Sequence, residues 1–113
     1  MYSFFQTLMT KIQTTEGYKD EYPVMFGGYY VFDQSLWELR YPDKTIGMYQ
    51  TFEVANYRDM RANIFRFFLG YNYNELIPDE EILNSEEYRS MPAYPDFGSV
   101  RVINETVVVK FSD

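Results

Sequence analysis

Hydrophobic and polar residues alternate most regularly between Val100 and Phe111, the stretch richest in β-branched residues. If Asn104 and Glu105 form a two-residue turn, strand alternation places one apolar set on a single face of a hairpin. That face carries Val100, Val102, Val107, Val109 and Phe111. The opposite face carries Arg101, Thr106 and Lys110, together with Ile103 and Val108. The pattern predicts a well-specified β-hairpin, because a one-residue slip would mix the two sets.

The turn is the least regular part of this hairpin. A type I′ turn suits Asn104 at its first central position, but it holds Glu105 at positive φ, where Gly is usual. A slightly longer turn is the alternative. An isolated hairpin is only marginally stable in water, so this one must pair with another strand or be covered by helices.

Two segments show apolar residues at three- and four-residue spacing, which predicts two amphipathic helices. The first runs from Tyr2 to about Thr15, with Gly17 as a stop signal. The second starts near Asn56, a suitable N-cap residue, and ends near Gly70. Its predicted apolar stripe consists of Tyr57, Met60, Ile64, Phe67, Phe68 and Tyr71. Such a stripe usually packs into the core.

Shorter elements are predicted between and after these helices. Val24–Phe26 is typical of a short buried strand that Gly27 and Gly28 end. Residues 41–52 have the composition of a loop. Three short helices are expected; the first is capped by Asp33 or Ser35, and the other two by Asp79 and Ser85. This order of elements predicts a single α/β domain over residues 1–113, a two-layer fold with a small mixed sheet of about three strands covered by helices.

Charge and composition exclude several kinds of chemistry. Ten basic and seventeen acidic residues give a net charge of −7, and no Lys/Arg cluster is present, which argues against nucleic acid as a partner. The absence of Cys and His removes Cys nucleophiles, Cys- or His-ligated zinc, disulfides and His-mediated proton transfer. The acidic run Asp79–Glu81 suits a helix N-terminus better than a metal site. We therefore assign no catalytic residue, metal ligand or cofactor.

Aromatic residues make up 20% of the chain, with twelve Tyr, ten Phe and one Trp. Tyrosines that follow the Gly27-Gly28 strand end are well placed for binding, because ligands of open α/β sheets lie beyond the carboxyl ends of strands. The candidate surface for a glycan or a protein partner consists of Tyr29, Tyr30, Trp37, Tyr41 and Tyr49. The alternative is that these rings only pack on the sheet.

Two segments resemble one family. The run Met91-Pro92-x-Tyr94-Pro95-x-x-Gly98-Ser99-Val100, continued by residues 107–111, is similar to the C-terminal end of bacterial multi-pass membrane glucosyltransferases of the Gtr type. The run Tyr22-Pro23-Val24 with Phe26-Gly27-Gly28, behind the first helix, resembles the segment that follows their last membrane span. The family often has an acidic residue and Gly in the hairpin turn, where this chain has Asn104-Glu105.

The resemblance implies a soluble, extracytoplasmic C-terminal domain of an enzyme that uses lipid-linked glucose to decorate cell-surface polysaccharide. The family's catalytic carboxylate lies near the start of the protein, and no residue here corresponds to it. The implied partners are the transmembrane part of the same enzyme and a carbohydrate chain.

Two other classes of function remain open. One is a free-standing, cytoplasmic binding or regulatory protein without enzymatic activity. The other is a small hydrolase, which would need convergent carboxylates. Its candidate residues are Asp33, Glu38 and Asp43.

Overall fold

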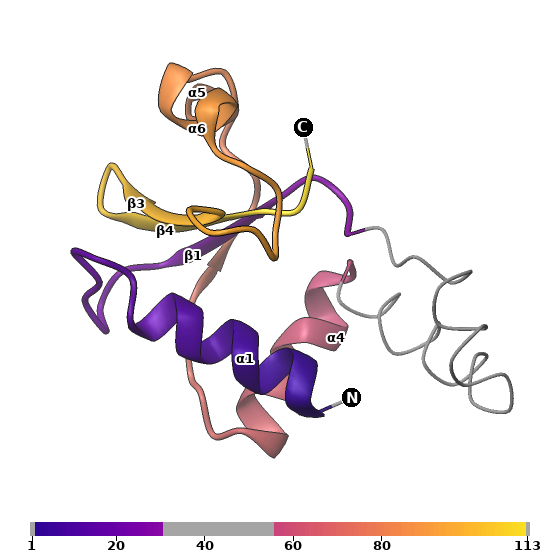
Figure 1. The fold of residues 1–113 in the computed structure, drawn as a ribbon. Coiled ribbons are helices and arrows are strands. Elements are labelled where there is room, and N and C mark those ends of the chain that lie inside the picture. Colours follow the sequence, from indigo (N-terminus) through magenta and orange to yellow (C-terminus); the bar gives the residue numbers. More distant parts are fainter. Residues whose placement is uncertain (1, 31–55, 113) are drawn as a thin grey trace, which may run out of the picture.

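A computed structural model describes residues 2–30 and 56–112 of the chain. These residues form a four-stranded mixed sheet with helices on both faces (Figure 1). The strand order is β2-β1-β4-β3. The strands are β1 (Val24–Gly27), β2 (Glu75–Leu76), β3 (Val100–Ile103) and β4 (Thr106–Lys110). The predicted α/β class is confirmed, and the sheet has one strand more than the expected three.

The predicted hairpin, β3 and β4, is present with the predicted register. Its antiparallel pairs are Val100 with Val109, Arg101 with Val108, Val102 with Val107, and Ile103 with Thr106. Asn104 and Glu105 both have positive φ, at 51° and 57°, as the central residues of a type I′ turn do. The tight turn is therefore formed, even though its second residue is Glu instead of Gly.

β1 joins the hairpin to the remaining strand of the sheet. It runs parallel to β4, from Val24 beside Val107 to Gly27 beside Lys110, and also parallel to β2. All five residues of β4 are buried, as expected of a strand covered on both faces. No pattern in the sequence indicates β2, because two residues are too few to show a strand period.

The larger core fills the face of the sheet next to α1 (Tyr2–Gln13). α4 (Arg58–Asn63) lies on the same side and continues directly into a π-helical turn, η2 (Ile64–Phe68) (Figure 1). The central residues of this core are Phe5, Leu8, Ile12, Val24, Phe65, Val107 and Val109, all with 0% exposure. The predicted apolar face of the hairpin therefore lies where the sequence places it.

A smaller core covers the opposite face, beneath α5 (Glu80–Leu83) and α6 (Glu86–Ser90) (Figure 1). Its members are Met25, Ile82, Tyr88, Met91, Ile103 and Val108. The predicted caps are confirmed, since Asp79 Oδ1 accepts from the backbone N–H of Glu81 and Ser85 Oγ accepts from that of Tyr88. These two helices add a third layer to the two that the sequence predicts.

The predicted apolar stripe of the second helix is wrong at most of its positions. Ile64 and Tyr71 are buried, but Tyr57, Met60, Phe67 and Phe68 are among the exposed large side chains. The buried face instead carries Arg61, Ile64 and Phe65. A π-helical turn is wider than an α-helical one, so the residues after Asn63 face a different direction from the one that regular spacing predicts.

Asn56 does not cap this helix. The N-cap residue is Tyr57, without a side-chain hydrogen bond. The Asn56 amide instead pairs with the backbone of Tyr30, because its Oδ1 accepts from Tyr30 N at 2.6 Å and its Nδ2 donates to Tyr30 O at 3.0 Å. A partner distant in sequence therefore replaces the predicted local one.

Candidate functional site

Two of the five residues of the predicted aromatic surface lie in the described part of the chain. Tyr29 is half exposed, and its backbone N–H donates to Ser112 Oγ at 2.8 Å. The Tyr30 ring is half-buried against the rings of Phe4, Tyr94 and Phe111, at centroid distances of 5.2, 6.1 and 5.6 Å. The other three, Trp37, Tyr41 and Tyr49, lie outside the described residues, as do Asp33, Glu38 and Asp43.

Other parts of the protein approach the backbone closely at Gly27 and Gly28. A Cβ atom on Gly27 would lie 2.2 Å from the Tyr88 hydroxyl oxygen. Gly28 has a φ of 78°, and a Cβ atom there would lie 2.3 Å from the carbonyl oxygen of Ser112. These distances are too short for any side chain, so the two glycines let α6 and the end of the chain pack against the strand end.

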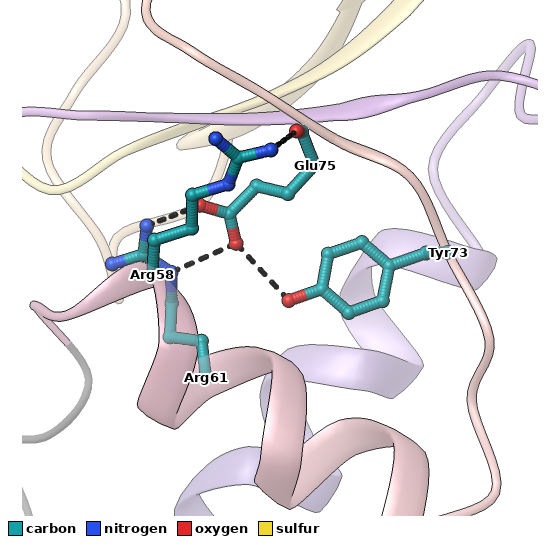
Figure 2. A network of polar contacts seen from close by, with 4 residues as sticks. All are labelled: Arg58, Arg61, Tyr73 and Glu75. Carbon is teal, nitrogen blue, oxygen red and sulfur yellow. Dashed lines mark hydrogen bonds and ion pairs between the residues drawn. The ribbon is translucent and has the colours of Figure 1, made fainter.

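A buried ion pair fixes α4 to β2 (Figure 2). Arg61 and Glu75 are buried, with side-chain exposures of 8% and 6%. Glu75 Oε1 accepts hydrogen bonds from Arg61 Nε and from the Tyr73 hydroxyl, both at 3.1 Å. Burial and the neighbouring Glu75 carboxylate raise the pKa of Tyr73, so this phenol stays protonated and donates.

The other two arginines of this helix bind backbone carbonyls. Arg58 Nη2 donates to the carbonyl oxygen of Glu75 at 2.7 Å, and Arg66 Nη2 donates to that of Tyr73 at 2.9 Å. Of these three arginines, Arg61 is the one that forms an ion pair with a carboxylate among the described residues. Because each group in Figure 2 contacts another group of the protein, we interpret the network as architectural.

Lys110 is a second buried charge. It is 3% exposed, and its Nζ donates to the carbonyl oxygens of Tyr88 and Arg89 at 3.1 and 3.3 Å. These carbonyls lie in the last turn of α6, where the helix dipole favours a cation. The Tyr88 ring centroid is 4.9 Å from Nζ, which adds a cation–π contact. Lys110 therefore holds α6 to the central strand.

An open groove of about 790 Å³ runs beside the free edge of β3, and we call it the α1–β3 groove. Three segments line it, the end of α1 and the residues after it (11 and 14–16), the loop 96–99, and β3 from Val100 to Val102. Its size is within the range of small-molecule sites. It is the best candidate site among the described residues, because it combines apolar surface with side chains of both charges.

Phe97 is the most exposed large hydrophobic residue of the described chain, at 101%. It lies on the groove's loop, between Asp96 and Gly98. The sequence analysis did not identify it, because the segment 91–98 has neither a helical nor a strand period. An aromatic residue directly before Gly, in a segment otherwise held by two prolines, was the signal that could have drawn attention to it.

Two further properties bear on the kind of site. Within residues 2–30 and 56–112, no three carboxylate, His or Cys side chains come close enough to bind a metal ion together. None of the helices in these ranges has the length and apolar character needed to cross a bilayer. No family model, no curated protein and no solved structure matches the chain.

Proposed function

We propose that this chain is the non-catalytic, C-terminal domain of a bacterial membrane glucosyltransferase of the Gtr type. It lies on the extracytoplasmic side and serves the modification of cell-surface polysaccharide. Its partners are the transmembrane part of the same enzyme and a carbohydrate chain.

One observation carries the proposal. The two segments that resemble the family, residues 22–28 and 91–111, are distant in sequence but adjacent in the fold. β1 pairs with β4 along its whole length. Phe111 N donates to Gly27 O at 2.8 Å, and Tyr94 N donates to Lys110 O at 2.7 Å. The residues that resemble the family therefore form one structural unit. This is expected if the chain and the family have these residues in common because both need them for the same fold.

The contacts of the buried charged residues support a non-catalytic role. Among the described residues, the buried ions Arg61, Glu75 and Lys110 all have protein partners. A catalytic centre would need a nucleophile or a proton donor supported by a second group beside a substrate space. The contacts of these three ions tie α4 to β2 and α6 to β4, which supports a positioning function.

The experiment compares the purified chain with the complete reading frame that encodes it. The reading frame should contain several apolar segments of about 20 residues upstream of Tyr2. Membranes that contain the whole product should transfer glucose from the lipid-linked donor, and the purified chain should not. A reading frame without such segments, or glucose transfer by the chain alone, would contradict the proposal, and the former would favour the free-standing binding protein.

A further inference from the structure

We propose that the α1–β3 groove binds a neutral oligosaccharide, with the ring of Phe97 as its stacking platform. This inference deepens the proposed function and rests on it only for the source of the glycan. The binding itself is argued from the residues that line the groove.

Phe97 presents an exposed ring on a loop whose backbone is fixed. Its ring is fully exposed, yet its loop is fixed on both sides. Ser99 N donates to Asp96 O at 3.1 Å, and Lys110 N donates to Ser99 O at 2.9 Å. Lys11 Nζ crosses from α1 to the carbonyl oxygen of Pro95 at 3.0 Å. Because the loop backbone that carries the ring is fixed before binding, little of the loop has to be ordered when a ligand stacks on the ring. The flat face of the ring suits the C–H face of a pyranose.

Several side chains that line the groove have hydrogen-bonding capacity to spare. Neither Glu16 nor Asp96 has a side-chain hydrogen bond or ion pair within the described residues. The hydroxyls of Thr14 and Thr15 donate to backbone carbonyls at 2.7 and 2.6 Å, so their lone pairs remain able to accept. Sugar hydroxyls both donate and accept, so one sugar can satisfy the carboxylates and the threonine oxygens together.

β3 is an edge strand of the described sheet. In an antiparallel pair, every second residue forms hydrogen bonds with the neighbouring strand. Because Lys110 N donates to Ser99 O, the residues that bond to β4 are Ser99, Arg101 and Ile103. The N–H and C=O groups of Val100 and Val102 therefore point away from β4, toward the groove. They provide fixed donors and acceptors beside the ring.

Charge and donor supply favour a neutral sugar over a peptide. The groove has two basic residues, Lys11 and Arg101, and two acidic residues, Glu16 and Asp96, so its formal charge is zero. A peptide strand added to β3 would spend its backbone amides on the N–H and C=O groups of Val100 and Val102. It would then cover the carboxylates of Glu16 and Asp96 without giving them hydrogen-bond donors, unless the peptide had basic side chains. A basic, extended peptide is therefore the competing ligand that the experiment must include.

The test is an NMR titration of the isotope-labelled 113-residue chain with maltotriose, cellotriose, laminaritriose and isomaltotriose. Shallow sugar sites bind weakly, so each sugar is added up to about 10 mM. We expect amide shifts at Phe97, Gly98, Val100 and Val102 with at least one sugar. Phe97→Ala should weaken that sugar at least about tenfold, and Phe97→Trp should keep binding.

Phe67→Ala is the matched control, because Phe67 is also an exposed ring but lies outside the groove, so sugar affinity should not change. If Phe97→Ala does not fold, Asp96→Asn replaces it, and the same loss is expected. The proposal is overturned if no sugar shifts these amides, if the variants bind as wild type does, or if an oligolysine peptide alone binds.

Sugar shifts confined to Tyr29, Tyr30, Trp37, Tyr41 and Tyr49 would also overturn the assignment to the groove, while favouring the surface predicted from the sequence. Failure of the glucosyltransferase proposal is separate from these outcomes. It is decided by the reading frame and the transfer assay, whereas the titration measures only whether the groove binds sugar.

Discussion

Arg61 occupies a position where an apolar side chain would be expected. It is on the buried side of α4, its guanidinium carbon lies 4.4 Å from the centroid of the Phe26 ring, and its charge is paired with Glu75. A buried pair of this kind depends on both members, because loss of one leaves an uncompensated charge away from water. The two residues therefore hold helix and strand together as a unit.

The first prediction concerns this pair. Glu75→Gln should lower the free energy of unfolding by about 3 kcal/mol, because Arg61 keeps its charge without a counter-ion. Arg58→Gln is the control, since Arg58 contacts only the backbone of Glu75 in an exposed position, and it should cost less than about 1 kcal/mol. Urea denaturation measures both variants. Equal losses would show that the buried charge pair has no special role.

At the residue scale, the sequence is informative where the partner is close along the chain. Asp79 and Ser85 cap their helices as predicted, because each accepts from an N–H two or three residues away. Asn56 was predicted as a cap by the same rule, but its partner Tyr30 is 26 residues away. Glu105 adopts positive φ because strand pairing on both sides closes the turn.

At the scale of elements, the segment 58–68 differs most from its prediction. A regular helix would bring Phe67 or Phe68 to the core, but the π-helical turn brings Phe65 there. The Phe65 ring makes edge-to-face contacts with Phe5, Tyr71 and Tyr73 at 5.4, 5.8 and 5.3 Å. No pattern of apolar residues distinguishes these two arrangements, because both place large hydrophobic residues at nearly the same positions.

The second prediction uses two phenylalanines of this one turn. Phe65→Ala should lower the free energy of unfolding by about 3–5 kcal/mol, because it removes a fully buried ring and leaves a cavity. Phe67→Ala should change it by no more than about 0.5 kcal/mol, because that side chain is 79% exposed. Thermal denaturation of both variants gives the comparison. A larger loss of stability at Phe67 would contradict this and indicate that Phe67 is buried, as in the predicted apolar stripe.

At the scale of the whole molecule, the tyrosines couple stability to pH. Burial raises the pKa of Tyr30, Tyr71 and Tyr73, and it raises that of Tyr94 to about 12. These phenols lose their protons less readily in the folded chain than in the unfolded chain, where the pKa is about 10. Their contribution to stability is therefore complete below about pH 10 and declines as the pH rises toward the folded values.

The third prediction follows from this linkage. Between about pH 10 and 12, the free energy of unfolding should fall by up to about 1.4 kcal/mol per pH unit for each such tyrosine. Urea denaturation at several alkaline pH values measures the slope, and tyrosinate absorbance follows the ionisation. Tyr94→Phe should make the decline shallower. Constant stability over this range would mean that the tyrosines ionise as readily in the folded chain as in the unfolded one.

The class of fold was predictable from the sequence, whereas the candidate site was not. Strand and helix periods, turn residues and caps are local, and they were enough to predict β1, the β3–β4 hairpin and α1, but not β2 or the layer that α5 and α6 form. The α1–β3 groove combines the end of α1 with a loop and a strand more than 80 residues later, so no local pattern indicates it. Its most distinctive residue, Phe97, has no periodic neighbours at all.

The position of β4 has a consequence for how the chain is synthesised. β4 is the strand between β1 and β3, and its residues 106–110 are translated after all the other helices and strands that the structure describes. Until they leave the ribosome, the two-residue β2 is the one strand of the described sheet that β1 can pair with, and the cores on both faces lack their central valines. Folding of this domain must therefore wait for its last strand, and a nascent chain that stops before Thr106 would expose both apolar surfaces to chaperones and proteases.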